Sequence, residues 1–166
     1  MNKRVPSLRA LLFLSLLVAP AARAQRGVIL VRHAEKEDAS KDTVLSKAGE
    51  ARARELARHL KDAGVTAIYT TQYQRTLLTA QPLAAALKIT PVVFATDKGD
   101  DALVQLLKEK HHDDVVLIVG HSNTVPSLLK KLGVPAVVTI DESEFDNLFF
   151  VSPRPDGPPA FLRLHY

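Results

Sequence analysis

The sequence predicts an α/β fold: a three-layer α/β/α sandwich with a mostly parallel central sheet and an antiparallel edge pair at the C-terminus. Two runs of branched aliphatic residues, 28–31 and 115–119, are typical of short strands buried on both faces. Segments with apolar residues at helical spacing alternate with such runs, which favours a parallel sheet covered by helices. Near the C-terminus, residues 148–151 and 161–164 flank a turn-rich linker and predict the antiparallel pair.

Residues 1–24 have the features of a secretory signal. The segment begins with three basic residues, Lys3, Arg4 and Arg9. An apolar run over residues 10–18 follows, and Ala22-Arg23-Ala24 then forms an A-x-A pattern that predicts cleavage after Ala24. The run is shorter than the roughly 20 residues that a membrane-spanning helix needs. We therefore expect one domain at 25–166, in a periplasmic or secreted protein without a membrane span once the signal is cleaved.

The excess of basic over acidic residues in the whole chain comes from residues 1–24. The chain has 22 Lys and Arg against 18 Asp and Glu, and four of the basic residues but no acidic ones lie within 1–24. The remaining chain is formally neutral, so its charge gives no reason to expect nucleic-acid binding. The absence of cysteine excludes disulfides, thiolate metal sites and cysteine nucleophiles.

The first half of the domain supplies two helices and a strand. Ser46 is expected to cap a helix that ends before Gly64, where a glycine suits the turn. Residues 65–69 predict the second strand. Residues 72–87 predict a helix, which we expect Pro82 to kink or split because proline lacks the N–H that the helix requires.

The second half continues the alternation of strands and helices. Residues 89–94 predict a third strand, and a proline near its start favours the edge of the sheet. Asp100 is expected to cap a helix over residues 101–110. A further helix is expected over residues 125–132, with Pro126 tolerated in its first turn.

Four basic or titratable side chains lie where predicted parallel strands end: Arg32, His33, Arg75 and His121. Open α/β sheets bind ligands at the carboxyl ends of their strands, so we expect these side chains to face one crevice. Arginine forks and helix N-termini both match phosphate oxygens. The pattern therefore predicts a site for a phosphate group.

A site with these side chains could support one of three kinds of chemistry. A metal site could use His33 and His121 as ligands, but the neighbouring arginines oppose cation binding. A serine hydrolase could use Ser122, but the sequence around it lacks the G-x-S-x-G elbow. In the third arrangement one histidine attacks phosphorus while the other basic groups hold the oxygens, and this arrangement fits the residues best.

Four motifs follow one another along the chain. VRHAEK at 31–36 is similar to an R-H-G signature, and LSKAGEA at 45–51 to an L-T-x-x-G stretch. YTTQYQRTLLTA at 69–80 is similar to S-S-P-x-x-R-x-x-Q-T-A, and VGHSNT at 119–124 to a second-histidine segment. Together they resemble the histidine phosphatase superfamily, branch 1, with its phosphoglycerate mutase-like fold.

The resemblance implies a role for each strand-end residue. His33 would be the nucleophile and would form a phosphohistidine intermediate that water then hydrolyses. Arg32, Arg75 and His121 would bind the phosphoryl oxygens and stabilise their charge, without a metal or another cofactor. His33 must attack through a neutral nitrogen, so its other ring nitrogen needs an acceptor, for which we expect a backbone carbonyl.

The chain departs from the family pattern at Ala34, Gln72 and Leu78, which replace a glycine, a proline and a glutamine without touching the inferred chemistry. The general acid is predicted at Asp97, which follows the third strand. Other candidates are Asp100, Glu35 and Asp38. Residues 141–144 form an acidic segment for which the alternatives are the border of the pocket and the solvated surface, and we expect the solvated surface. We expect four further histidines on the surface as well: His59, His111, His112 and His165.

Only 45 residues separate Arg75 from His121, so the chain resembles compact family members such as the short phosphohistidine phosphatases. We expect an exported, metal-independent phosphatase acting on a phosphorylated small molecule, a phosphoprotein or a phosphorylated envelope component. The alternative is a non-catalytic module that binds such a component. The sequence does not determine the oligomeric state.

Overall fold

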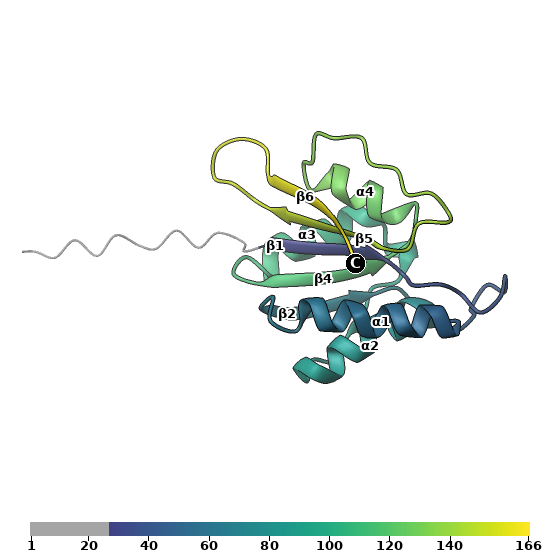
Figure 1. The fold of residues 1–166 in the computed structure, drawn as a ribbon. Coiled ribbons are helices and arrows are strands. Elements are labelled where there is room, and N and C mark those ends of the chain that lie inside the picture. The colour runs from purple at the N-terminus through teal and green to yellow at the C-terminus, as the bar shows by residue number, and fades with distance from the viewer. Residues whose placement is uncertain (1–26) are drawn as a thin grey trace, which may run out of the picture.

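The computed structural model describes residues 27–166, which form a six-stranded sheet in the order β3-β2-β4-β1-β5-β6 (Figure 1). Four neighbouring strands are parallel: β1 (Gly27–Arg32), β2 (Val65–Thr70), β3 (Val92–Val93) and β4 (Val115–Gly120). An antiparallel pair, β5 (Asn147–Ser152) and β6 (Ala160–His165), completes the sheet beside β1. The predicted fold class is confirmed. The predicted signal at 1–24 lies outside the described residues.

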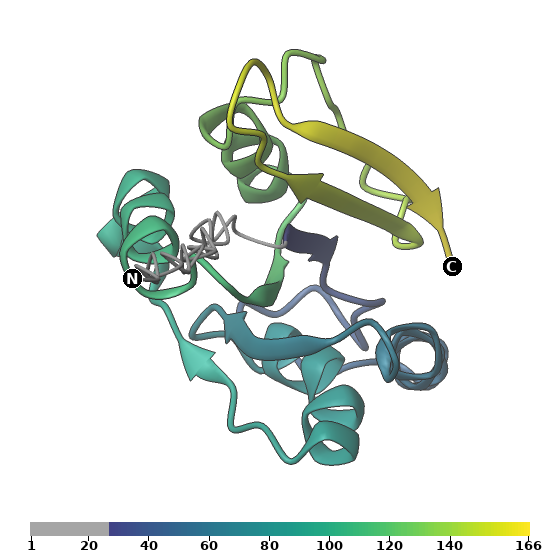
Figure 2. The same ribbon diagram turned by 90° about the vertical axis from the view of Figure 1, so that its left-hand side faces the viewer.

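Two helices cover each face of the sheet, as Figures 1 and 2 show from two sides. The helices α1 (Lys47–Leu60) and α2 (Gln74–Leu87) pack on one face. The helices α3 (Asp100–Lys110) and α4 (Thr124–Lys131) pack on the other, and a short 3₁₀ helix, η1 (Thr96–Lys98), precedes α3. None of the helices in the described part of the chain is long and apolar enough to cross a bilayer.

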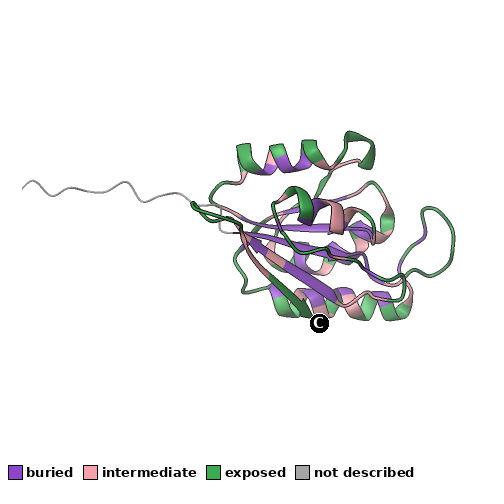
Figure 3. Ribbon diagram, turned by 90° about the horizontal axis from the view of Figure 1, so that it is seen from above, coloured by how far each residue is buried: buried purple, intermediate pink, exposed green. Residues whose placement is uncertain are grey.

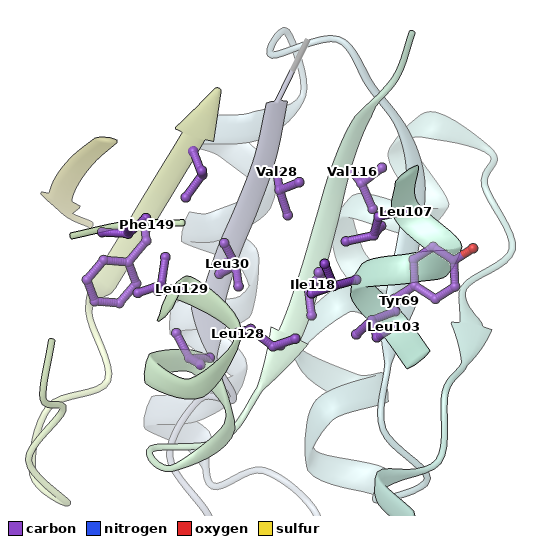
Figure 4. Close-up of a cluster of buried hydrophobic side chains, with 14 of the residues drawn as sticks. Val28, Leu30, Tyr69, Leu103, Leu107, Val116, Ile118, Leu128, Leu129 and Phe149 are labelled. Carbon is purple, nitrogen blue, oxygen red and sulfur yellow. The ribbon is translucent and has the colours of Figure 1, made fainter. Parts of the chain in front are cut away.

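The strand β1 supplies side chains to both cores. Val28 and Leu30 pack with α3, α4 and Phe149 in the cluster drawn in Figure 4. Ile29 and Val31 point the other way and pack with α1 and α2. Because successive strand residues face opposite sides, a strand covered on both faces needs a continuous apolar run. Figure 3 shows the result, with buried central strands and exposed outer faces on the helices.

The start of α1 is as predicted, but its end is not. The Ser46 side chain accepts the N–H of Gly49 at 3.1 Å and caps the helix. The helix ends at Leu60 rather than continuing to Gly64. Residues 61–64 form a turn, in which Gly64 adopts a φ of 73° that favours glycine before the chain enters β2.

Pro82 does not split α2, contrary to one form of the prediction, and the helix starts at Gln74 rather than residue 72. A proline removes one hydrogen bond of the helical ladder. The residues after it, Leu83 and Ala84, are buried against the sheet, and this packing keeps the helix continuous to Leu87.

The predicted cap of α3 is wrong. Gly99, with a φ of 78°, occupies the cap position, and Asp100 is the first residue of the helix, where its charge complements the helix dipole. The strand β3 is reduced to two residues and lies at the edge, as predicted. The helix α4 begins at Thr124, one residue earlier than expected.

Candidate active site

The register of two strands brings the two predicted histidines together. β1 pairs in parallel with β4, and Arg32 lies opposite Gly120. His33 and His121 are the next residues of the two strands, so they leave the sheet at the same edge. Their ring centroids are 5.3 Å apart with an interplanar angle of 65°, and the backbone N–H of His33 donates to the carbonyl of Gly120 at 2.9 Å.

The turn after β4 requires a residue without a side chain. A Cβ atom at Gly120 would lie 2.8 Å from the Thr124 hydroxyl oxygen. That hydroxyl accepts the backbone N–H of His121 at 2.9 Å and so orients the residue at the start of α4. The G-H pair of the second-histidine motif therefore has a steric cause.

The protonation of the His33 ring follows from its backbone contact. Its Nδ1 lies 2.8 Å from the carbonyl oxygen of Ala34. A carbonyl only accepts, so Nδ1 carries the hydrogen and Nε2 keeps its lone pair. Ala34 in turn donates its N–H to the Thr79 hydroxyl at 2.9 Å, and Thr79 donates to the carbonyl of Arg75 at 2.7 Å. Thr79 thus ties the nucleophile loop to α2, a link that the sequence did not suggest.

Both histidines are held in the neutral form. Burial, together with the charges of Arg75 and Arg32, lowers the pKa of His33 from 6.5 to about 4. Burial also lowers the pKa of His121 to about 4, with added contributions from His33 and the same arginines. Neutral imidazole is the form that a nitrogen nucleophile requires.

Arg32 is almost fully buried, with an exposed fraction of 2%. Its Nη1 donates to the carbonyl oxygens of Asp141 and Glu144 at 2.8 and 3.0 Å, and its guanidinium lies 4.2 Å from the centroid of the Phe145 ring. The phosphate-binding arginine predicted from the motif therefore also anchors the loop between α4 and β5.

Arg75 reaches the site from the first turn of α2. Its guanidinium stacks 4.3 Å from the centroid of the Tyr73 ring, and its Nη1 donates to the carbonyl of Lys41 at 2.8 Å. The Nε atoms of Arg32 and Arg75 are buried without an acceptor in the described part of the chain. Buried N–H donors of this kind suit an anion that carries several oxygens.

The four predicted basic residues line one cleft of about 350 Å³. Its wall also contains seven other residues: Lys36, Tyr73, Thr96, Ser122, Asn123, Thr124 and Glu142. Within residues 27–166, no group of three or more His, Asp or Glu side chains is arranged to hold a metal ion.

None of the four carboxylates proposed as general acid lines this cleft. Asp97 is exposed in η1, although its neighbour Thr96 borders the cleft. Each of the other three lies elsewhere. Asp100 is in the first turn of α3, and Glu35 forms an ion pair with Arg52, with an N–O distance of 2.7 Å. The Asp38 carboxylate accepts the backbone N–H of Ser40 at 2.8 Å.

Glu142 is the carboxylate that does line the cleft. Its Oε2 lies 2.5 Å from Nη2 of Arg32, and its Oε1 accepts the Ser122 hydroxyl at 2.5 Å. The side chain is 79% exposed, as expected for a solvated segment, yet it contacts a predicted phosphate ligand. The sequence pattern does not predict the contact between Glu142 and Arg32, because 110 positions separate the two residues.

One other histidine departs from the expected solvated turn. The side chain of His111 is 15% exposed, and its Nδ1 lies 2.7 Å from Asp114. Its Nε2 lies 2.8 Å from the Tyr69 hydroxyl, which joins the end of α3 to β2. None of these three side chains lines the cleft, and their contacts link α3 to β2.

The parallel strands of this α/β sandwich end at two neutral histidines that share a cleft with two arginines. Such a set of side chains suits the binding of a phosphoryl group. The family model described as "Histidine phosphatase superfamily (branch 1)" matches residues 28–97, which contain three of the four motifs. This match confirms the resemblance to the family that the motifs indicate. A search of curated proteins finds no significant match.

Solved structures agree on the fold. The protein histidine phosphatase SixA complexed with tungstate is 19% identical, with a TM-score of 0.66, over 84% of this chain and 96% of that one. The putative phosphohistidine phosphatase SixA from Agrobacterium tumefaciens is 20% identical, with a TM-score of 0.65, over 83% and 98%. A mycobacterial glucosyl-3-phosphoglycerate phosphatase with inorganic phosphate is 14% identical, with a TM-score of 0.66, over 85% and 96%.

Proposed function

We propose that this protein is an exported, metal-independent phosphatase that hydrolyses phosphomonoesters, or removes phosphate from a phosphoprotein, through a phosphohistidine on His33. One observation carries the proposal. The hydrogen bond from His33 Nδ1 to the Ala34 carbonyl leaves the Nε2 lone pair available in a cleft shared with Arg32, Arg75 and His121. The match of residues 28–97 to the histidine phosphatase family model supports the same activity.

The reaction proceeds in two displacements at phosphorus. In the first, the Nε2 lone pair of His33 forms a bond to phosphorus, and the bond from phosphorus to the ester oxygen breaks. In the second, a water oxygen attacks phosphorus and the P–N bond breaks, which returns the lone pair to His33 and releases phosphate. Each transfer spreads negative charge over three oxygens.

The basic side chains of the cleft neutralise this charge. The buried Nε–H groups of Arg32 and Arg75 have no other acceptor in the described chain. His121 adds a ring nitrogen beside the nucleophile, with its Nε2 placed 3.1 Å from the Thr71 hydroxyl. Donors fixed before the reaction stabilise the transferring group at little cost in reorganisation.

Catalysis is tested with p-nitrophenyl phosphate in the presence of EDTA. We expect turnover by the wild-type protein and its loss in His33→Ala, with acid-labile phosphate trapped on the wild type alone. His59→Ala is the matched control, because His59 lies on an exposed face of α1, where it contacts Glu55 and Tyr166, and it does not line the cleft. Turnover that survives His33→Ala, or that EDTA abolishes, contradicts the proposal.

The position of Asp97 outside the cleft favours a second candidate function. Without a proton donor, the same cleft would bind a phosphorylated envelope component without turnover. The trapping experiment separates the two functions, because a binding module would bind inorganic phosphate but accumulate no phosphohistidine. Trapped phosphate on His33 rules the module out.

The substrate class and the location need their own tests. One similar structure is described as a protein histidine phosphatase and another as a putative phosphohistidine phosphatase, and this supports a phosphoprotein among the substrates. A panel of sugar phosphates, nucleotides and phosphorylated protein would rank them by kcat/KM. Export predicts a mature protein in the periplasm or medium whose N-terminal residue is Gln25, which mass spectrometry of the fractions would detect.

A further inference from the structure

We propose that Glu142 is the residue that exchanges the proton with the leaving group, a role that rests on the proposed phosphatase function. Glu142 is the carboxylate that lines the cleft together with His33 and His121. Its two oxygens contact Arg32, which would bind the phosphate, and Ser122, which follows His121. A donor for the leaving group must stand beside the phosphate in this way.

The loop that carries Glu142 is held on both sides of it. The carbonyls of Asp141 and Glu144 both accept from Nη1 of Arg32. The Asp141 side chain accepts the N–H of Ser143 at 2.9 Å, and the Glu144 side chain accepts the N–H of Asp141 at 3.1 Å. Glu142 therefore projects from a turn that is fixed against the phosphate-binding arginine.

The contacts of Glu142 also explain how a bound phosphate would raise its pKa and so favour its protonated form. The groups that face it are Ser122, Arg32 and His33; the Ser122 hydroxyl and then the Arg32 charge lower the pKa of Glu142 in the free protein. A phosphate dianion on Arg32 would compensate that positive charge and add negative charge beside the carboxylate. Nearby negative charge raises the pKa of a carboxyl group, so substrate binding favours the protonated acid.

The proton transfers accompany the two displacements at phosphorus. As Nε2 of His33 attacks phosphorus, the P–O bond to the leaving group breaks, and the proton of Glu142 moves to that oxygen and gives a neutral alcohol. The resulting carboxylate accepts a proton from the water that attacks the phosphohistidine. The P–N bond breaks, phosphate leaves, and both His33 and Glu142 return to their starting forms.

Leaving groups of different basicity provide the test. p-Nitrophenolate leaves without a proton, whereas the alkoxide of an alkyl phosphate needs one. In Glu142→Gln we expect kcat/KM for glycerol phosphate to fall about 100-fold or more, the size of a lost general acid, while kcat/KM for p-nitrophenyl phosphate changes only a few-fold. The same variant should accumulate phosphohistidine during p-nitrophenyl phosphate turnover, because the water-activating base is missing.

Two further variants complete the experiment. Glu109→Gln alters an exposed carboxylate of α3 that contacts Gln105, and it should leave both substrates unaffected. Asp97→Asn tests the rival donor. An equal effect of Glu142→Gln on both esters, a gain in kcat/KM, or a leaving-group-dependent loss in Asp97→Asn instead overturns the assignment of Glu142 while the phosphatase stands. A wild-type protein that hydrolyses neither ester overturns both proposals.

Discussion

The imidazole rings of His33 and His121 lie edge to face with centroids 5.3 Å apart, although the two residues are far apart in sequence. Each ring is buried, and each lies near the same two arginines. A proton on either ring would add a further positive charge beside Arg32 and Arg75. The pair therefore stays neutral over a wide range of pH, and this property affects both catalysis and stability.

The pH dependence of catalysis should reflect the low pKa of His33. kcat/KM for p-nitrophenyl phosphate reports ionisation in the free protein. After correction for ionisation of the substrate, its acid limb should lie near the pKa of about 4 rather than at 6.5, because protonated His33 has no lone pair to attack phosphorus. An acid limb near pH 6.5 would contradict the neutral pair.

The free energy of unfolding should also depend on the protonation of these two histidines. The unfolded chain takes up protons at these histidines below pH 6.5, while the folded chain takes them up only near pH 4. The free energy of unfolding is therefore expected to decrease as the pH falls from 6.5 to 4. Urea denaturation at several pH values measures the slope, which should be shallower in His121→Gln; an unchanged slope would count against the prediction.

Arg75→Ala should damage catalysis much more than stability. The loss of one charged donor to the transferring phosphoryl group costs about 10²–10³-fold in kcat. In the described part of the chain the guanidinium donates to the Lys41 carbonyl and stacks on the Tyr73 ring, and the loss of these two contacts should change the melting temperature little. Arg54→Ala on the exposed face of α1 is the control. Full activity in Arg75→Ala would remove this residue from the site.

Gly49→Ala should destabilise the protein even though alanine favours helices. An added Cβ would lie 2.2 Å from the carbonyl oxygen of Glu35, so α1 or the nucleophile loop would have to move. Overpacking of this kind costs about 1–3 kcal/mol, which urea denaturation would measure. The exposed neighbour Ala48 provides the control as Ala48→Ser. A stabilised Gly49→Ala protein would show that the contact relaxes freely.

The parts of the fold that depend on local pattern could be predicted. Continuous aliphatic runs marked β1 and β4, and Ser46 marked the start of α1 because capping involves only neighbouring residues. Helix boundaries at Pro82 and Asp100 could not be placed, since core packing holds α2 together and the backbone of Gly99 supplies the start of α3. In both cases the packing and backbone conformation around a residue outweigh its own preference for or against a helix position.

The sequence by itself determined where the basic site residues stand, because a buried parallel strand must end at a defined edge and its next residue must emerge there. This rule is enough to predict that His33 and His121 lie at the same edge of the sheet. Only the tertiary structure placed Glu142 in the cleft, since its loop has no periodicity and is positioned by Arg32, 110 residues away. It also placed Asp97 outside the cleft. Strand ends follow from local periodicity, whereas contacts made by an irregular loop follow from the packing of the whole chain.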